Sequence, residues 1–149
     1  MIYKILFFII TLATFSLSDI IGVRQDFHKL QNDDQVMRYL DKYKSCSVQE
    51  SIPYLAAARM QRAQYAFYPH KKIEYFNTGK EKIDNYIKLH PACVEGRYVR
   101  LLVQSSVPSF LGYSGNKGAD KSFILANIET SELPSEYKKT ILKNIHTID

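Results

Sequence analysis

The spacing of apolar side chains is the feature that most constrains the fold of this chain. From about residue 20 onward, apolar residues recur at intervals of three and four, and the alternation typical of strands is nearly absent. This period places the apolar side chains along one stripe of a helix, and such a stripe must be buried against a neighbour. The sequence therefore predicts an all-α fold with about six to seven helices.

Punctuating residues divide this pattern into segments. Asn32-Asp33-Asp34 is a start signal, Pro53 suits a first helical turn, and Pro91 ends a helix. The expected helices are one with Val23, Phe27 and Leu30; one with Val36, Leu40 and Tyr43; one from Ser51 to Phe67; one from Lys71 to His90, after a break at Tyr68-Pro69-His70; one from Cys93 to about Ser105; one with Phe123, Ile124 and Ile128; and one with Leu133, Tyr137, Ile141 and Ile145.

Short connections between these segments favour antiparallel neighbours, so we expect a stack of helical hairpins in a single domain, residues 19–149. A helix that ends at Pro91 and passes at once to a new amphipathic helix is typical of tetratricopeptide-type repeats. Gly79 and Ile83 lie where that pattern expects a small and a large residue. No second copy of the signature follows, so the prediction is a tetratricopeptide-like arrangement.

The first 18 residues predict a secretory signal peptide. Lys4 forms a basic head, an apolar run extends from Ile5 to Phe15, and Ser16-Leu17-Ser18 supplies small residues before a cleavage site at Asp19. A membrane anchor is the alternative, but the apolar run would rise only about 16 Å as a helix, against a hydrocarbon core of about 30 Å. We therefore expect a periplasmic or secreted protein with no stable transmembrane segment after cleavage.

The charge of the chain is modest and its signs are interleaved. The formal net charge is +5, and removal of Lys4 with the signal peptide lowers it by one. No polybasic tract is present, so we expect no binding to nucleic acid.

Two cysteines, Cys46 and Cys93, follow the predicted cleavage site. An oxidising compartment permits a disulfide between them, which by the chain-entropy model would contribute about 4 kcal/mol, and two buried free thiols are the alternative. The histidines are not spaced to share one helix face, so the sequence predicts neither a metal site nor a cofactor.

The glycine-rich stretch GYSGNKGADKS, residues 112–122, raises the question of a phosphate-binding loop. A Walker loop requires lysine and then serine or threonine after its last glycine, whereas Gly118 is followed by Ala119 and Asp120. We interpret the stretch as a turn in which Asn116 or Asp120 caps the helix that follows.

Arg97 and Arg100 are three residues apart and share a face of an otherwise apolar helix, with Glu95 on another face. One interpretation is a structural network in which an arginine pairs with an acidic residue of the preceding helix, such as Glu74 or Glu81. The other is that an arginine opens into a groove and receives a carboxylate or phosphate, which a guanidinium binds with two parallel hydrogen bonds.

Tyrosines are concentrated in the middle of the chain. Core packing over alanine and glycine is the default interpretation, and a row of phenols on an inner surface would instead suit peptide or glycan contacts. The residues concerned are Tyr54, Tyr65, Tyr68, Tyr75, Tyr86 and Tyr98.

Residues 54–113 resemble a family of small exported bacterial proteins that are all-helical and tetratricopeptide-like. The resemblance implies export and a helical fold, and it implies no activity. The residues that carry it are the alanine-rich helix, Pro69 with Lys71-Lys72, Tyr75-Phe76-Asn77 with Gly79-Lys80, Glu95 with Arg97 and Arg100, and Pro108 before Phe110-Leu111-Gly112-Tyr113.

The sequence shows no catalytic constellation, since it has no nucleophile elbow and no singled-out pair of carboxylates. We therefore expect a non-enzymatic helical module that binds a protein or peptide partner in the cell envelope. The candidate ligand-binding residues are Arg97, Arg100, Tyr75 and Lys80. The alternative is a small envelope hydrolase whose carboxylates or serines converge only in three dimensions.

Overall fold

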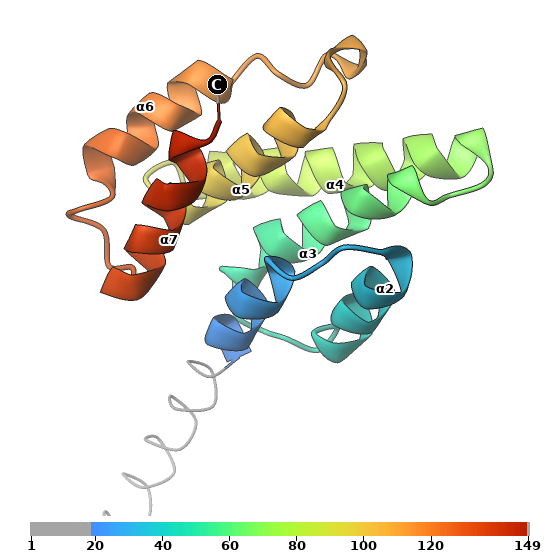
Figure 1. Ribbon diagram of the computed structural model, residues 1–149, viewed down its shortest axis with the longest axis horizontal. Helices are drawn as coiled ribbons and strands as arrows, with labels where there is room; N and C mark the ends of the chain where they lie inside the picture. The colour runs from blue at the N-terminus through green and yellow to red at the C-terminus, as the bar shows by residue number, and fades with distance from the viewer. Residues whose placement is uncertain (1–18, 149) are drawn as a thin grey trace, which may run out of the picture. The chain divides into compact units, whose positions relative to one another are not determined.

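The computed structural model of the chain describes residues 19–148 (Figure 1). Within this part the regular elements are seven α-helices and two short 3-10 helices, with no strand, so the all-α prediction is confirmed. The expected signal peptide, residues 1–18, lies outside the described residues.

The helices follow one another with short connections. A helix over residues 19–27 comes first, and the later elements are α2 (Asp33–Lys42), α3 (Ser51–Gln61), η1 (Arg62–Gln64), α4 (Pro69–Leu89), α5 (Val94–Ser106), η2 (Ser109–Leu111), α6 (Lys117–Asn127) and α7 (Ser135–His146).

The chain divides into two compact units, the first ending at Lys82 and the second beginning at Ile83. The division falls within α4, so the first part of this helix belongs to the first unit and its last turns belong to the second.

The core of the first unit is built from aromatic rings and small side chains. The ring centroids of Phe27 and Tyr54 are 5.2 Å apart in an edge arrangement, and the Tyr39 hydroxyl donates a hydrogen bond to the carbonyl oxygen of Val23 at 3.2 Å. Asn32 caps α2 by accepting from the backbone N–H of Gln35 at 3.0 Å, as its start signal predicts. The buried apolar residues of this unit include Val23, Val36, Tyr54, Ala56, Ala57, Ala58 and Met60.

The second unit buries isoleucine, leucine and valine side chains of α5, α6 and α7, and α5 packs against α6. Tyr98 of α5 is fully buried, and its hydroxyl accepts a hydrogen bond from the Asn144 side chain of α7 at 2.6 Å. Its ring lies edge-on to that of Tyr137, with centroids 6.4 Å apart. These contacts tie α7 to α5.

The end of the third helix differs from the prediction. The α-helix stops at Gln61, tightens into η1, and gives way to an irregular segment over residues 65–68. Pro69 is the first residue of α4 rather than part of a break, because its missing N–H costs nothing at that position and it disfavours helical geometry at Tyr68. Phe67, expected as the last residue of this helix, consequently lies outside it and is 88% exposed.

Gly79 marks a close approach of α4 to α3. A Cβ atom placed at Gly79 would lie 2.7 Å from the carbonyl oxygen of Ala56 and would also meet the Met60 side chain. Only glycine fits at that separation, which agrees with the expectation of a small residue here.

The glycine-rich stretch forms the predicted turn. Gly112 closes η2 with a φ angle of 64°, in the left-handed region that glycine adopts without strain. A new helix, α6, then begins at Lys117.

Within the described part of the chain, no helix combines the length and the apolar character that a membrane span requires.

Candidate functional site

Arg97 and Arg100 of α5 converge on one carboxylate. Arg100 donates from Nε and Nη2 to the two oxygens of Asp120, at 2.7 and 2.8 Å, and Arg97 donates from Nη1 to Asp120 Oδ1 at 3.1 Å. Asp120 is fully buried on α6, and the Arg100 side chain is 10% exposed. The pair therefore forms a bidentate, charge-assisted contact inside the second unit.

A second carboxylate completes what we call the arginine–aspartate network, made of Asp84, Arg97, Arg100, Tyr113 and Asp120. Asp84 of α4 accepts from Arg100 Nη1 at 3.1 Å and from the Tyr113 hydroxyl at 3.0 Å. Burial would lower the pKa of Arg100, but its hydrogen bonds to Asp120 and Asp84 raise that pKa above its usual value. The guanidinium thus stays charged in its buried position.

The remaining donors of Arg97 are also engaged. Its Nε and Nη2 donate to the carbonyl oxygen of Pro91, at 3.3 and 3.1 Å, and the guanidinium carbon lies 4.1 Å from the centroid of the Phe123 ring. These contacts hold the end of α4, the start of α5 and α6 together. The geometry of both arginines is that of the structural network, one of the two interpretations that the sequence left open.

The identity of the acidic partners could be only partly predicted. An acidic residue of the preceding helix does bind Arg100, but it is Asp84 rather than Glu74 or Glu81. Asp120 was expected as a possible helix cap, and it is instead the centre of the network, while Asn116 precedes α6 without a side-chain cap bond. The spacing of an aspartate one turn into α6 gives no signal of this role.

Tyr75 lines a cleft in the first unit that we call the aromatic cleft. It has a volume of about 220 Å³ and lies between the start of α2, η1, the segment 65–68 and the start of α4. Exposed rings border it: Tyr65 is 41% exposed, Phe67 88% and Tyr68 59%. The full lining is Asp33, Arg62, Tyr65, Ala66, Phe67, Tyr68, Lys71 and Tyr75.

Polar contacts fix the walls of the aromatic cleft. Arg62 donates from Nε to Asp33 at 3.2 Å and lies over the Tyr75 ring, with its guanidinium carbon 4.9 Å from the ring centroid. The Tyr65 hydroxyl donates to the carbonyl oxygen of Gln31 at 3.1 Å. Lys71 pairs with Glu74 at 2.7 Å. The charges of Arg62, Asp33 and Lys71 are therefore matched within the chain, and the Phe67 ring, 88% exposed, is the most accessible surface of the cleft.

The other candidate residues lie outside this cleft. Lys80 is a half-buried residue of α4 in the first unit. Cys46, in the first unit, and Cys93, in the second, are both half-buried free thiols here, and their pairing stays a prediction. Over residues 19–148, no group of three or more histidine, cysteine, aspartate or glutamate side chains is placed to hold a metal ion.

The sequence left Tyr65 and Tyr68 open between core packing and a binding surface, and it gave no sign that Phe67 is exposed, because an aromatic residue at helical spacing is usually core. A signal is visible in retrospect: Tyr65, Phe67 and Tyr68 precede Pro69, which starts a helix and leaves the residues before it irregular.

Comparison with known proteins adds no relative. No family model, no curated protein and no solved structure matches this chain significantly.

Proposed function

We propose that this protein is a non-enzymatic helical module that binds an extended segment of a partner polypeptide through the aromatic cleft. The observation that carries the proposal is the cleft itself, in which exposed rings of Tyr65, Phe67 and Tyr68 face outward next to a fixed wall at Tyr75. Tyr75 was a candidate on sequence grounds, and it is the one candidate that lines this cleft.

The charge of the cleft favours an uncharged polypeptide segment over an ion. Arg62 and Lys71 are each paired with a carboxylate, so the cleft offers no unmatched cation to select an anion. The exposed rings of Tyr65, Phe67 and Tyr68 are the recognition element that remains, and extended peptides dock on aromatic-lined grooves.

The exposed rings also supply a driving force for binding. An aromatic side chain buries about 150 to 250 Å² when it is fully covered. At about 25 cal/mol per Å², covering Phe67 alone would contribute about 4 to 6 kcal/mol before the costs of association. Phe67 is therefore the residue whose removal should weaken binding most.

A selection from a random peptide library tests the proposal. We expect the wild-type protein to enrich peptides with aliphatic, aromatic or proline side chains, because these cover ring faces. Phe67→Ser should weaken the best peptide by about tenfold or more, equivalent to about 1.4 kcal/mol, measured by fluorescence anisotropy.

Phe110→Ser is the matched control, because Phe110 is 84% exposed on η2 and lines no part of the aromatic cleft. Equal weakening by both substitutions would contradict the assignment of the site. Failure to enrich any peptide, with binding of an oligosaccharide to the same rings instead, would replace the polypeptide by a glycan.

The place of action and the finer architecture belong to the same proposal. The basic head, apolar run and small residues of positions 1–18 support export to the periplasm or the medium. The passage from α4 to α5 through Pro91 and the close approach at Gly79 support a tetratricopeptide-like arrangement of hairpins. The resemblance of residues 54–113 to small exported bacterial proteins points the same way.

Export is tested by expressing the full chain in a bacterium with two membranes. We expect the mature protein in the periplasmic or medium fraction with Asp19 as its first residue, read by N-terminal sequencing. An intact chain that stays with the cytoplasm, starting at Met1, would contradict export and would leave the binding proposal to be judged on its own test.

A further inference from the structure

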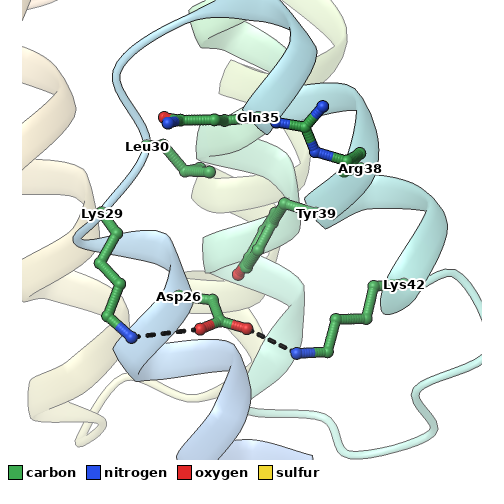
Figure 2. Close-up of a pocket in the computed structure, with 7 residues that line it drawn as sticks. All are labelled: Asp26, Lys29, Leu30, Gln35, Arg38, Tyr39 and Lys42. Atoms are coloured by element: carbon green, nitrogen blue, oxygen red, sulfur yellow. Dashed lines mark hydrogen bonds and ion pairs between the residues drawn. The ribbon is translucent and has the colours of Figure 1, made fainter.

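A second cleft of the first unit, here called the basic cleft, has a different chemistry. It has a volume of about 260 Å³ and lies between residues 26–30 and α2. Figure 2 shows its lining residues arranged in two polar ends with an apolar wall between them. One end holds Asp26, Lys29 and Lys42, the other holds Gln35 and Arg38, and the wall is formed by Leu30 and Tyr39.

The charges at the first end are satisfied within the chain. Asp26 accepts from Lys42 at 2.7 Å, from the Tyr43 hydroxyl at 2.8 Å and from Lys29 at 3.5 Å. The hydrogen bonds from Lys42 and Tyr43 lower the pKa of Asp26, so its carboxylate remains ionised to accept them. These contacts hold residues 26–29 against α2, and the two lysines outnumber the single carboxylate at this end.

The other end carries an unmatched cation. Arg38 is exposed, and its side chain makes no hydrogen bond, ion pair or ring contact with the described part of the chain. Figure 2 shows its guanidinium near the base of the Gln35 side chain, whose amide extends away from it. A guanidinium with free N–H groups at the end of a cleft can bind a carboxylate through two parallel hydrogen bonds.

The amide of Gln35 is oriented by the backbone. Its Oε1 accepts a hydrogen bond from the backbone N–H of Gln31 at 2.8 Å. The N–H groups of its Nε2 take no part in that bond and are available to donate to a ligand. The end of the cleft therefore presents donors from two side chains, Arg38 and Gln35. Leu30 and Tyr39 supply the apolar surface that leads away from it (Figure 2).

We propose that the basic cleft binds a carboxylate-bearing ligand, with the carboxylate on Arg38 and Gln35 and a short apolar chain on Leu30 and Tyr39. A single negative charge fits, because Arg38 is the one cation of the cleft lining that lacks a carboxylate partner. The lining as a whole carries three cations, Lys29, Arg38 and Lys42, and one carboxylate, so it favours an anion over a cation. This site is independent of the aromatic cleft, and either can exist without the other.

An NMR titration of the ¹⁵N-labelled protein with hexanoate tests the proposal. We expect saturable shifts of the backbone amides of Leu30, Gln35 and Arg38, and no such response to hexylamine, which has the same chain with the opposite charge. Hexylamine shifting these amides at the same concentration, or hexanoate leaving them unmoved, would overturn the proposal.

Two substitutions probe the donors, and a third serves as the control. Arg38→Gln should weaken hexanoate binding by about tenfold. Gln35→Glu should do the same, since a carboxylate keeps the acceptor for Gln31 N–H but removes the donor. Arg59→Gln should leave binding unchanged, because Arg59 is exposed on α3 and lines neither cleft. Equal affinities for all three variants would refute the site.

The source of the carboxylate is distinguished by a second ligand. Tighter binding of the peptide acetyl-Ala-Glu-Ala-amide than of hexanoate would assign the site to acidic side chains of a polypeptide, whereas the reverse order would assign it to a free small acid. Both outcomes support carboxylate recognition at Arg38 and Gln35. Equal binding of the matching glutamine peptide would contradict it.

Discussion

Substitution of Asp120 by asparagine is expected to destabilise the second unit by about 3 kcal/mol. Asp120 is fully buried and accepts three side-chain hydrogen bonds, two from Arg100 and one from Arg97. Asparagine has the same shape but no charge, so the substitution removes the anion and leaves the guanidinium groups buried without it.

The magnitude follows from burial. Removal of one partner of a buried ion pair costs about 3 to 5 kcal/mol, because the remaining charge keeps its desolvation cost. Two features place Asp120→Asn at the lower end: the Arg97 side chain is 20% exposed, and Asp84 continues to accept from Arg100 at 3.1 Å. With a urea m-value of about 2 kcal/mol per M, the unfolding midpoint should fall by about 1.5 M.

Urea unfolding followed by circular dichroism measures this change. Asp41→Asn is the control, because Asp41 and Lys44 form an ion pair with side chains 76% and 68% exposed, whose loss should change the stability little. If Asp120→Asn cost no more than Asp41→Asn, the network would not stabilise the unit and the account of Arg97 and Arg100 as structural residues would be wrong.

Two further predictions concern packing and pH. Gly79→Ala should destabilise the first unit by about 1 to 3 kcal/mol in thermal unfolding, since the added methyl group would overlap the Ala56 carbonyl oxygen. Gly118→Ala is the control: a Cβ atom at Gly118 meets no atom within 4 Å, so this substitution should be neutral or stabilising. Burial raises the pKa of Tyr98 to about 12 in the folded protein, whereas its ordinary value is near 10. Between pH 10 and pH 12 the phenol is therefore ionised more readily in the unfolded chain, and the free energy of unfolding falls as the pH rises. Tyr98→Phe should reduce the loss of unfolding free energy between pH 9 and pH 11.5 by about 2 kcal/mol, measured by urea titration at the two pH values. An unchanged pH dependence would contradict the burial argument.

Local signals in the sequence predicted much of the fold. The apolar period gave the helices because each stripe must be buried, and Asn32 and Pro91 marked boundaries through capping and through the missing N–H of proline. Gly79 could be placed at a close contact because only a missing side chain allows it. The end of α3 could not be placed, because the apolar period continues through residues 62–67 although the helix does not.

The candidate sites were harder to predict because they depend on contacts distant in sequence. Arg97 and Arg100 were identified as a pair, but their main partner, Asp120, comes from a helix after the glycine-rich turn. Arg38 and Gln35 gave no signal, since exposed polar residues on a helix usually face water. What distinguishes Arg38 is its place at the end of a cleft, and periodicity does not report that.

The central claim is that the aromatic cleft is a polypeptide-binding site, and an NMR interface map with the best library-selected peptide tests it most directly. The account predicts intermolecular nuclear Overhauser effects between the peptide and the rings of Phe67, Tyr68 and Tyr75 at saturation. Effects confined to residues outside those lining the cleft, with these rings unmoved in the complex, would contradict it.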